Sequence, residues 1–221
     1  MARSLSASPD EVIGGNVYPK YTTRNPLARL LVAGFLRALD ELVACSGARD
    51  IHEVGCGEGF LSSRLAARGH RVRGCDLSQA AIAVAVRRAE VLGLPVRFRT
   101  ADVYRLVPET DAAELVVCCE VLEHVDEPER ALAVLAGLAR PWLIVSVPRE
   151  PLWRLLNVAR GRYLRAFGNT PGHVQHWSMP AFRQMVGRHV EVVEQKTPLP
   201  WTMLLCRARP HPAAEPHRTS Q

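Results

Sequence analysis

The sequence has no hydrophobic run long enough to cross a bilayer and no C-x-x-C pair of cysteines. A membrane-spanning helix needs about 20 consecutive apolar residues, whereas the most apolar stretches, Leu27–Leu39 and Trp142–Val147, are shorter or broken by arginine. The six cysteines contain no C-x-x-C pair, which argues against a zinc ribbon and a disulfide framework. Residues 1–10 lack the apolar segment of a secretory signal, so we expect a cytoplasmic protein.

Charged residues are not in excess either, at 23% of a chain that is 48% hydrophobic, so a folded domain is expected. The net charge of +6 favours anionic partners through long-range attraction. We predict an N-terminal cap helix region at 1–49, a core at 50–207 and a disordered tail at 208–221. An insertion at about 148–177 is expected to act as a substrate lid on the core.

Short β-type runs alternate with helical patterns from residue 50 onward. Such alternation builds a parallel sheet with helices on both faces, and ligands bind at the carboxyl ends of its strands. Asn25 is the expected N-cap of a first helix, and Asp126 that of the helix beginning at Pro128. We therefore predict an α/β fold with a doubly wound, mostly parallel, seven-stranded sheet. The strands are expected at 51–54, 72–75, 96–99, 115–119, 142–147, 190–193 and 203–207, and the helices at 26–44, 60–68, 79–92, 128–139 and 179–188.

Three alternate glycines follow the first predicted strand. Gly55, Gly57 and Gly59 let the chain turn sharply and leave no β-carbon between the backbone and a flat ligand. Their amide groups are expected to point outward, toward that ligand. In the dinucleotide fingerprint G-x-G-x-x-G a further glycine follows, and Phe60 occupies that place here. Such a turn also occurs where a strand merely meets a helix, so the glycines alone leave both interpretations open.

Acidic residues follow the next two predicted strands. Asp76 comes about 20 residues after the glycine turn, where its carboxylate can accept both ribose hydroxyls of a nucleoside. Asp102 can accept the amine of an adenine ring that lies between Leu77 and Val103. Each aspartate alone also fits a turn or a helix cap, but the set predicts a nucleoside site.

The motifs EVGCGEG, GCDLS and TADV, in this order, resemble the class I S-adenosylmethionine-dependent methyltransferases over residues 50–147. The resemblance implies a Rossmann-like fold and S-adenosyl-L-methionine as the cofactor. It also implies which residues contact the cofactor: Gly55, Cys56, Gly57 and Gly59 at the methionine part, Glu53 near its ammonium group, Asp76 at the ribose, and Asp102 with Val103 at the adenine.

The fourth predicted strand ends in CCEVLEHV, which resembles the ubiquinone-biosynthesis type of small-molecule O-methyltransferase. This segment lies just beneath the sulfonium in that group, which implies that Glu120 contacts the cofactor. In similar enzymes an N-terminal segment closes over the cofactor, and this implies contacts by Tyr18 and Lys20. Lys20 is then either a partner of the methionine carboxylate or an ordinary surface lysine.

Methyl transfer from a sulfonium mainly requires a nucleophile held in line at close range. An acceptor that must lose a proton also needs a base, and histidine titrates near neutral pH. His124, His173 and His176 are therefore the catalytic candidates, although each also fits a structural role through a hydrogen bond. The predicted reaction transfers methyl to an oxygen or nitrogen of a small-molecule acceptor by direct displacement.

Residues 149–165 interleave arginines with apolar residues. The pattern fits basic amphipathic helices that touch an anionic membrane or an acidic substrate. It also fits an ordinary packed helix pair with a solvated basic face, so both interpretations stay open.

Two other functions also stay open. Glu120, Glu123, His124, His173 and His176 have the side chains of a divalent metal site, and the arrangement resembles the RNA 3′-terminal ribose 2′-O-methyltransferases. RNA is a partner only in that case, DNA is expected in neither, and the favoured interpretation uses no metal. A non-catalytic nucleoside-binding module would keep the same glycines and Asp76.

Overall fold

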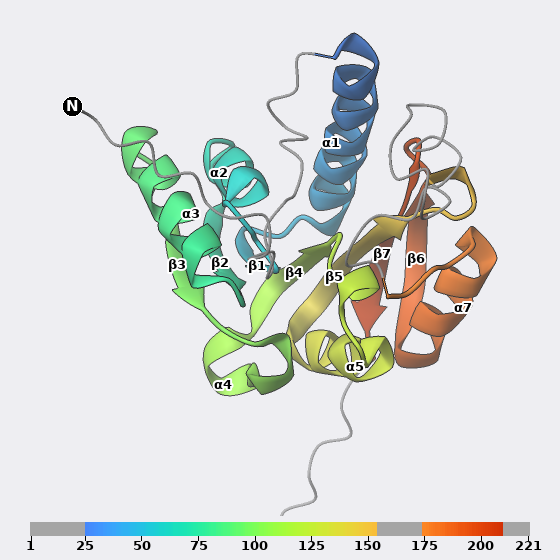
Figure 1. Cartoon of the computed structure of the whole chain (residues 1–221). Coiled ribbons are helices and arrows are strands. Elements are labelled where there is room, and N and C mark those ends of the chain that lie inside the picture. Colours follow the sequence, from blue (N-terminus) through green and yellow to red (C-terminus); the bar gives the residue numbers. More distant parts are fainter. Residues whose placement is uncertain (1–24, 154–173, 210–221) are drawn as a thin grey trace, which may run out of the picture.

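The computed structural model describes residues 25–153 and 174–209, within which seven strands form one sheet (Figure 1). The strand order is β3-β2-β1-β4-β5-β7-β6. Strands β1 to β5 pair in parallel, whereas β7 runs antiparallel to both β5 and β6. The predicted α/β class, the seven strands and the antiparallel end of the sheet are confirmed. The strands are β1 (Asp50–Val54), β2 (Arg71–Asp76), β3 (Arg97–Thr100), β4 (Ala113–Cys119), β5 (Ala139–Pro148), β6 (Val190–Lys196) and β7 (Trp201–Ala208).

Helices cover both faces of this sheet (Figure 1). Leu39 of α1 and Leu65 of α2 are fully buried against one face, and Leu135 of α5 and Phe182 of α7 are fully buried against the other. Among the described residues, no helix combines the length and apolar character needed to span a bilayer. The helices are α1 (Pro26–Ser46), α2 (Phe60–Ala66), α3 (Gln79–Val91), α4 (Pro108–Asp111), α5 (Pro128–Leu138) and α7 (Met179–His189), with the 3₁₀ turns η1 (Val103–Arg105) and η2 (Leu122–His124).

Strand β4 lies at the centre of the sheet and is buried on both faces. Leu115 and Val117 join the core cluster beneath α1 and α2, while Val116 and Cys118 join the cluster beneath α5 and α7. This alternation follows from the two-residue repeat of a strand. Because β1 and β5 both pair in parallel with β4, the carboxyl ends of all three strands meet at one edge of the sheet.

The helix ends test the predicted caps. Asn25 caps α1 as predicted, because its Oδ1 accepts hydrogen bonds from the amide nitrogens of Leu27 at 2.9 Å and Ala28 at 3.2 Å. The cap predicted at Asp126 is wrong. Helix α5 follows Glu127, whose side chain makes no capping hydrogen bond. Pro128, at the start of that helix, has no amide hydrogen that needs a partner.

Candidate active site

The glycine turn joins β1 to α2 at the carboxyl edge of the sheet. Gly55, Gly57 and Gly59 have φ of 76°, 51° and 70°, a left-handed conformation that glycine adopts at little cost. The expectation that their amides point outward is wrong. The amides of Gly55 and Cys56 both donate to the Cys75 carbonyl, at 2.8 and 2.9 Å, and that of Gly59 donates to the Cys56 carbonyl at 2.9 Å. The turn is therefore held rigid by the protein itself.

Two of the glycines are also required by packing. A β-carbon on Gly55 would lie 2.2 Å from Val121 Cγ2, and one on Gly59 would lie 2.8 Å from both Ala85 and Phe98. Gly59 is buried, whereas Gly55 and Gly57 are partly exposed. The surface that the turn can offer to a ligand is therefore that of Gly55 and Gly57, while Gly59 shapes the turn from the inside.

The Asp76 carboxylate faces this turn. Its Oδ2 accepts a hydrogen bond from the Gly57 amide at 2.8 Å, and its Oδ1 accepts one from the Ser78 amide at 2.8 Å. Ser78 in turn caps α3, because its Oγ accepts from the Ala81 amide at 3.2 Å. Each carboxylate oxygen has a further lone pair for a ligand hydroxyl. Strand β2 thus presents a fixed acceptor beside the turn, as the sequence predicts.

Two side chains beneath the turn are sealed from solvent. The Glu53 carboxylate is buried and accepts a hydrogen bond from Ser62 Oγ on α2. Burial, with the carboxylates of Glu53 and Asp76 nearby, raises the pKa of the Cys56 thiol far above its usual value. A thiol must ionise to act as a nucleophile, so this environment disfavours a nucleophilic role for the Cys56 thiol.

A hollow of about 520 Å³ lies at the carboxyl ends of β2 and β3. Leu77 and Asp102 both line it, and the Leu77 side chain is 63% exposed, which leaves an apolar face for a flat ring. Asp102 Oδ1 accepts from the Tyr104 amide at 2.9 Å, so the carboxylate is held in place. Val103 is instead partly buried against the core and is not among the lining residues, so the predicted sandwich has only its Leu77 side.

Glu120 follows β4 on the far side of the glycine turn from Asp76. Its carboxylate Oε2 accepts a hydrogen bond from Trp201 Nε1 at 2.6 Å, and its Oε1 accepts one from Ser146 Oγ at 3.5 Å. Both partners belong to the strands beyond β4, so the carboxylate points away from β1. Glu120 is thus at the predicted edge, but it is directed toward β5 and β7.

The two histidine candidates that the structure describes, His124 and His176, lie on neighbouring segments. His124 is exposed in η2, where its amide donates to the Val121 carbonyl at 2.9 Å. His176 is also exposed, and it directly follows Val174 and Gln175, whose amides both donate to the Glu123 carbonyl. Tyr18, Lys20 and His173 lie outside the described residues, as does most of the segment 149–165.

The alternative metal site gains no support from its described members. In residues 25–153 and 174–209, no three His, Cys, Asp or Glu side chains gather as a metal site would require. Glu123 of η2 is only 1% exposed, whereas His124 and His176 are exposed. The fifth member, His173, falls outside the described residues.

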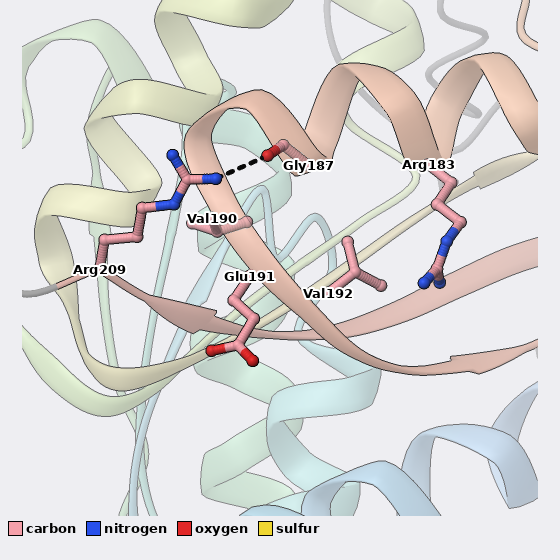
Figure 2. A pocket seen from close by; sticks show the side chains of 6 residues that line it. All are labelled: Arg183, Gly187, Val190, Glu191, Val192 and Arg209. Carbon is pink, nitrogen blue, oxygen red and sulfur yellow. Dashed lines mark hydrogen bonds between the residues drawn. The ribbon is translucent and has the colours of Figure 1, made fainter.

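The structure has a second hollow (Figure 2). It is formed by the end of α7 and the start of β6, the last strand of the sheet order. The Arg209 side chain donates to the Gly187 carbonyl at 2.9 Å and so gives a carbonyl in the last turn of α7 a hydrogen-bond partner. This contact gives Arg209 a structural role, and we do not assign the hollow to the active site.

Several residues of the site have no signal in the sequence. Ser62, Val121 and Trp201 contact Glu53, Gly55 and Glu120 from other elements. Only Ser78 has a local sign, since a serine directly before a helical pattern is typical of an N-cap.

Comparison with known protein families shows which proteins this part of the chain is similar to. Residues 51–141, which contain β1 through the glycine turn to the start of β5, match the family model described as a methyltransferase domain. Over these residues the chain is similar to methyltransferase domains. The match includes Glu53, the turn, Asp76 and Asp102, so these residues lie within the range that is similar to methyltransferases.

The curated relatives are similar to this chain over only part of their own length. A ubiquinone biosynthesis O-methyltransferase of Coxiella burnetii is 33% identical over 106 residues, covering 48% of this chain and 45% of the relative. The enzyme of the same name from Hahella chejuensis is 36% identical over 130 residues, covering 57% and 54%. The chain thus spans about half the length of the curated relatives it matches.

Solved structures share the fold of this chain over most of its length. A magnesium protoporphyrin IX methyltransferase from Synechocystis PCC 6803, crystallised with bound SAH, is 23% identical with a TM-score of 0.64, and the match covers 85% of this chain and 89% of that one. A Pyrococcus horikoshii OT3 protein is 15% identical with a TM-score of 0.67, covering 87% and 97%. At these identities the likeness concerns the fold.

Proposed function

We propose that this chain transfers a methyl group from S-adenosyl-L-methionine to an oxygen or nitrogen of a small-molecule acceptor by direct displacement. The observation that carries the proposal is the Asp76 carboxylate, held against the glycine turn by the Gly57 amide at 2.8 Å. The named activities of the relatives and the SAH bound in the Synechocystis enzyme support it. The observed groups fit the cofactor, because a rigid turn, a ribose acceptor and a hollow lined by Leu77 and Asp102 follow one another along the edge.

Different residues of this chain bind different parts of the cofactor. Asp76 accepts the ribose hydroxyls, and Asp102 with Leu77 binds the adenine in the hollow beside β3. The buried Glu53 places negative charge beneath the turn, which favours a cationic ammonium group above it. When bound, the cofactor supplies an electrophilic methyl group, and the protein contributes mainly position and orientation.

The acceptor side is assigned less narrowly. A small molecule is the acceptor class that the named relatives favour. Catalysis by His124, His173 or His176, contacts by Tyr18 and Lys20, and membrane or acidic-substrate contact through 149–165 all stay predictions. A cytoplasmic location also stays a prediction.

The first test is cofactor affinity in Asp76→Ala, measured by calorimetry with S-adenosylmethionine and with its demethylated product, S-adenosylhomocysteine. We expect at least about a tenfold loss, since a hydrogen bond to a charged group contributes about 1.5–3 kcal/mol. Glu90→Gln is the matched control, because Glu90 is an exposed carboxylate at the far end of α3 and should bind as the wild type does. Unchanged affinity in Asp76→Ala would remove the ribose assignment.

Incubation with methyl-labelled cofactor and a panel of small phenols, alcohols and amines tests the reaction itself. Label that stays on the cofactor with every acceptor would favour the non-catalytic binding module. Transfer that occurs only to short RNA and only with a divalent metal would favour the RNA alternative.

A further inference from the structure

The backbone at the end of β4 has an unusual conformation. Glu120 has a φ of 61°, and it is the one non-glycine residue with positive φ in the part of the chain that the structure describes. A left-handed conformation is unfavourable for a residue with a β-carbon, so surrounding contacts must impose it. Its amide donates to the Ser146 carbonyl at 3.0 Å, which ties the turn to β5. In this conformation the Glu120 side chain is directed toward β5 and β7.

The carboxylate is then fixed by groups from two other strands. The indole Nε1 of Trp201, the first residue of β7, lies 2.6 Å from Glu120 Oε2. Ser146 Oγ lies 3.5 Å from Oε1, and both partners are almost completely buried. Glu120 itself is partly exposed. A buried donor therefore holds the carboxylate while part of the residue faces solvent.

Aromatic rings surround the Trp201 indole. Phe35 of α1 meets it edge-on with ring centroids 5.1 Å apart, and the Trp153 ring is tilted against it with centroids 5.8 Å apart. Phe35 is buried, whereas Trp153 is partly exposed. Two partly exposed residues, Glu120 and Trp153, therefore both contact the Trp201 indole.

Glu120 also directly adjoins the cofactor turn. Val121, the residue after Glu120, packs so closely on Gly55 that a β-carbon there would overlap it. Glu120 therefore lies between the glycine turn and Trp201, on the side of β4 opposite Asp76. An acceptor that attacks a group bound over the turn must approach through this half of the edge, because β1 and β2 carry the cofactor contacts.

We propose that Glu120 and Trp153 form an acceptor-binding subsite for a cationic amine, and that Trp201 positions the Glu120 carboxylate in it. This inference rests on the proposed function, because it places the acceptor beside the cofactor. A carboxylate forms strong charge-assisted hydrogen bonds with an ammonium group. The face of a tryptophan also attracts cations. Both groups disfavour an anion, so the subsite discriminates by charge.

The test uses three probes that share one ring and differ in charge: benzylamine, benzyl alcohol and benzoate. Each is titrated into the full chain by ligand-observed NMR, with and without S-adenosylhomocysteine. We expect benzylamine to bind at least about tenfold more tightly than benzyl alcohol, with benzoate the weakest. Glu120→Gln should reduce the preference for the amine to within about threefold, because the charge is lost while the size is kept.

Trp201→Phe tests positioning, because it keeps an aromatic ring and removes the N–H donor. It should weaken benzylamine binding severalfold and leave benzyl alcohol unchanged, a change in selectivity that a purely structural role does not produce. Trp142→Phe is the matched control, since Trp142 lies at the opposite end of β5, beside Arg207, and should keep the full preference. Should Trp201→Phe fail to fold, Glu120→Gln still decides.

Two outcomes would overturn the inference: no binding of benzylamine at millimolar concentration, or an amine preference that survives Glu120→Gln. Cofactor-product binding, recorded on the same samples, separates this failure from that of the proposed function. If S-adenosylhomocysteine binds and the amine preference is absent, only the subsite is wrong. If S-adenosylhomocysteine does not bind, the proposed function is wrong.

Discussion

A single buried histidine gives the chain a pH-dependent stability. His52 of β1 is 1% exposed, and its Nδ1 donates to the Asp111 carbonyl at 2.8 Å. Burial lowers the pKa of His52 below its usual 6.5, and the nearby charges of Arg73 and Arg99 act in the same direction. The ring is therefore neutral in the folded chain at a pH where it is already protonated in the unfolded chain.

The sign follows from proton binding. Below about pH 6.5 the unfolded chain binds one proton more than the folded chain at this residue, so acid favours unfolding. We expect the free energy of unfolding to fall by up to about 1.4 kcal/mol per pH unit below that point, and to be constant above it as far as His52 is concerned. In His52→Asn, which keeps a donor for the Asp111 carbonyl, this part of the decline should vanish. Urea unfolding of both proteins between about pH 8 and pH 5.5 measures it, and parallel declines would contradict the assignment.

At the scale of elements, glycines in a helix and in a turn should respond oppositely to alanine. Gly34 lies inside α1 with open space where a β-carbon would stand, so Gly34→Ala should raise the free energy of unfolding by about 0.5–1 kcal/mol. Gly55 has a positive φ and faces Val121, so Gly55→Ala should lower it by at least about 2 kcal/mol. Denaturant midpoints of the two variants test both signs, and a neutral Gly55→Ala would show that the turn yields easily.

The same contrast separates what the sequence could predict from what it could not. The strands, the helices and the Asn25 cap depend on local periodicity and on neighbours within one turn, so their positions follow from the printed residues. Glu120 and Trp201 are 81 residues apart in the sequence. The close approach of Val121 to Gly55 depends on how β1 and β4 pair. The amides of the glycine turn were expected to point toward a ligand, but the Cys75 carbonyl on the next strand takes two of them. Contacts between strands therefore decide the details of the site.

The whole molecule places its functional edge where separate elements meet. The turn after β1, Asp76 at the end of β2 and Glu120 after β4 come from three parallel strands, and α1 adds Phe35 from one face. A ligand that contacts the turn, Asp76 and Glu120 together connects the ends of these three strands. Binding should therefore stabilise the molecule as a unit.

This linkage predicts a thermal shift. A ligand that binds only the folded state at about 100 times its dissociation constant adds about 2.7 kcal/mol to the free energy of unfolding. For a chain of this size each kcal/mol raises the melting temperature by about 2–4 °C, so saturating S-adenosylhomocysteine should raise it by about 5–10 °C. Asp76→Ala at the same ligand concentration should show a clearly smaller rise, because fewer molecules are bound, whereas Glu90→Gln should shift as the wild type does. Scanning calorimetry of the three proteins measures the effect. An equal rise in wild type and Asp76→Ala would mean that the ligand binds elsewhere, because stabilisation through this edge must pass through the carboxylate that the Gly57 amide holds.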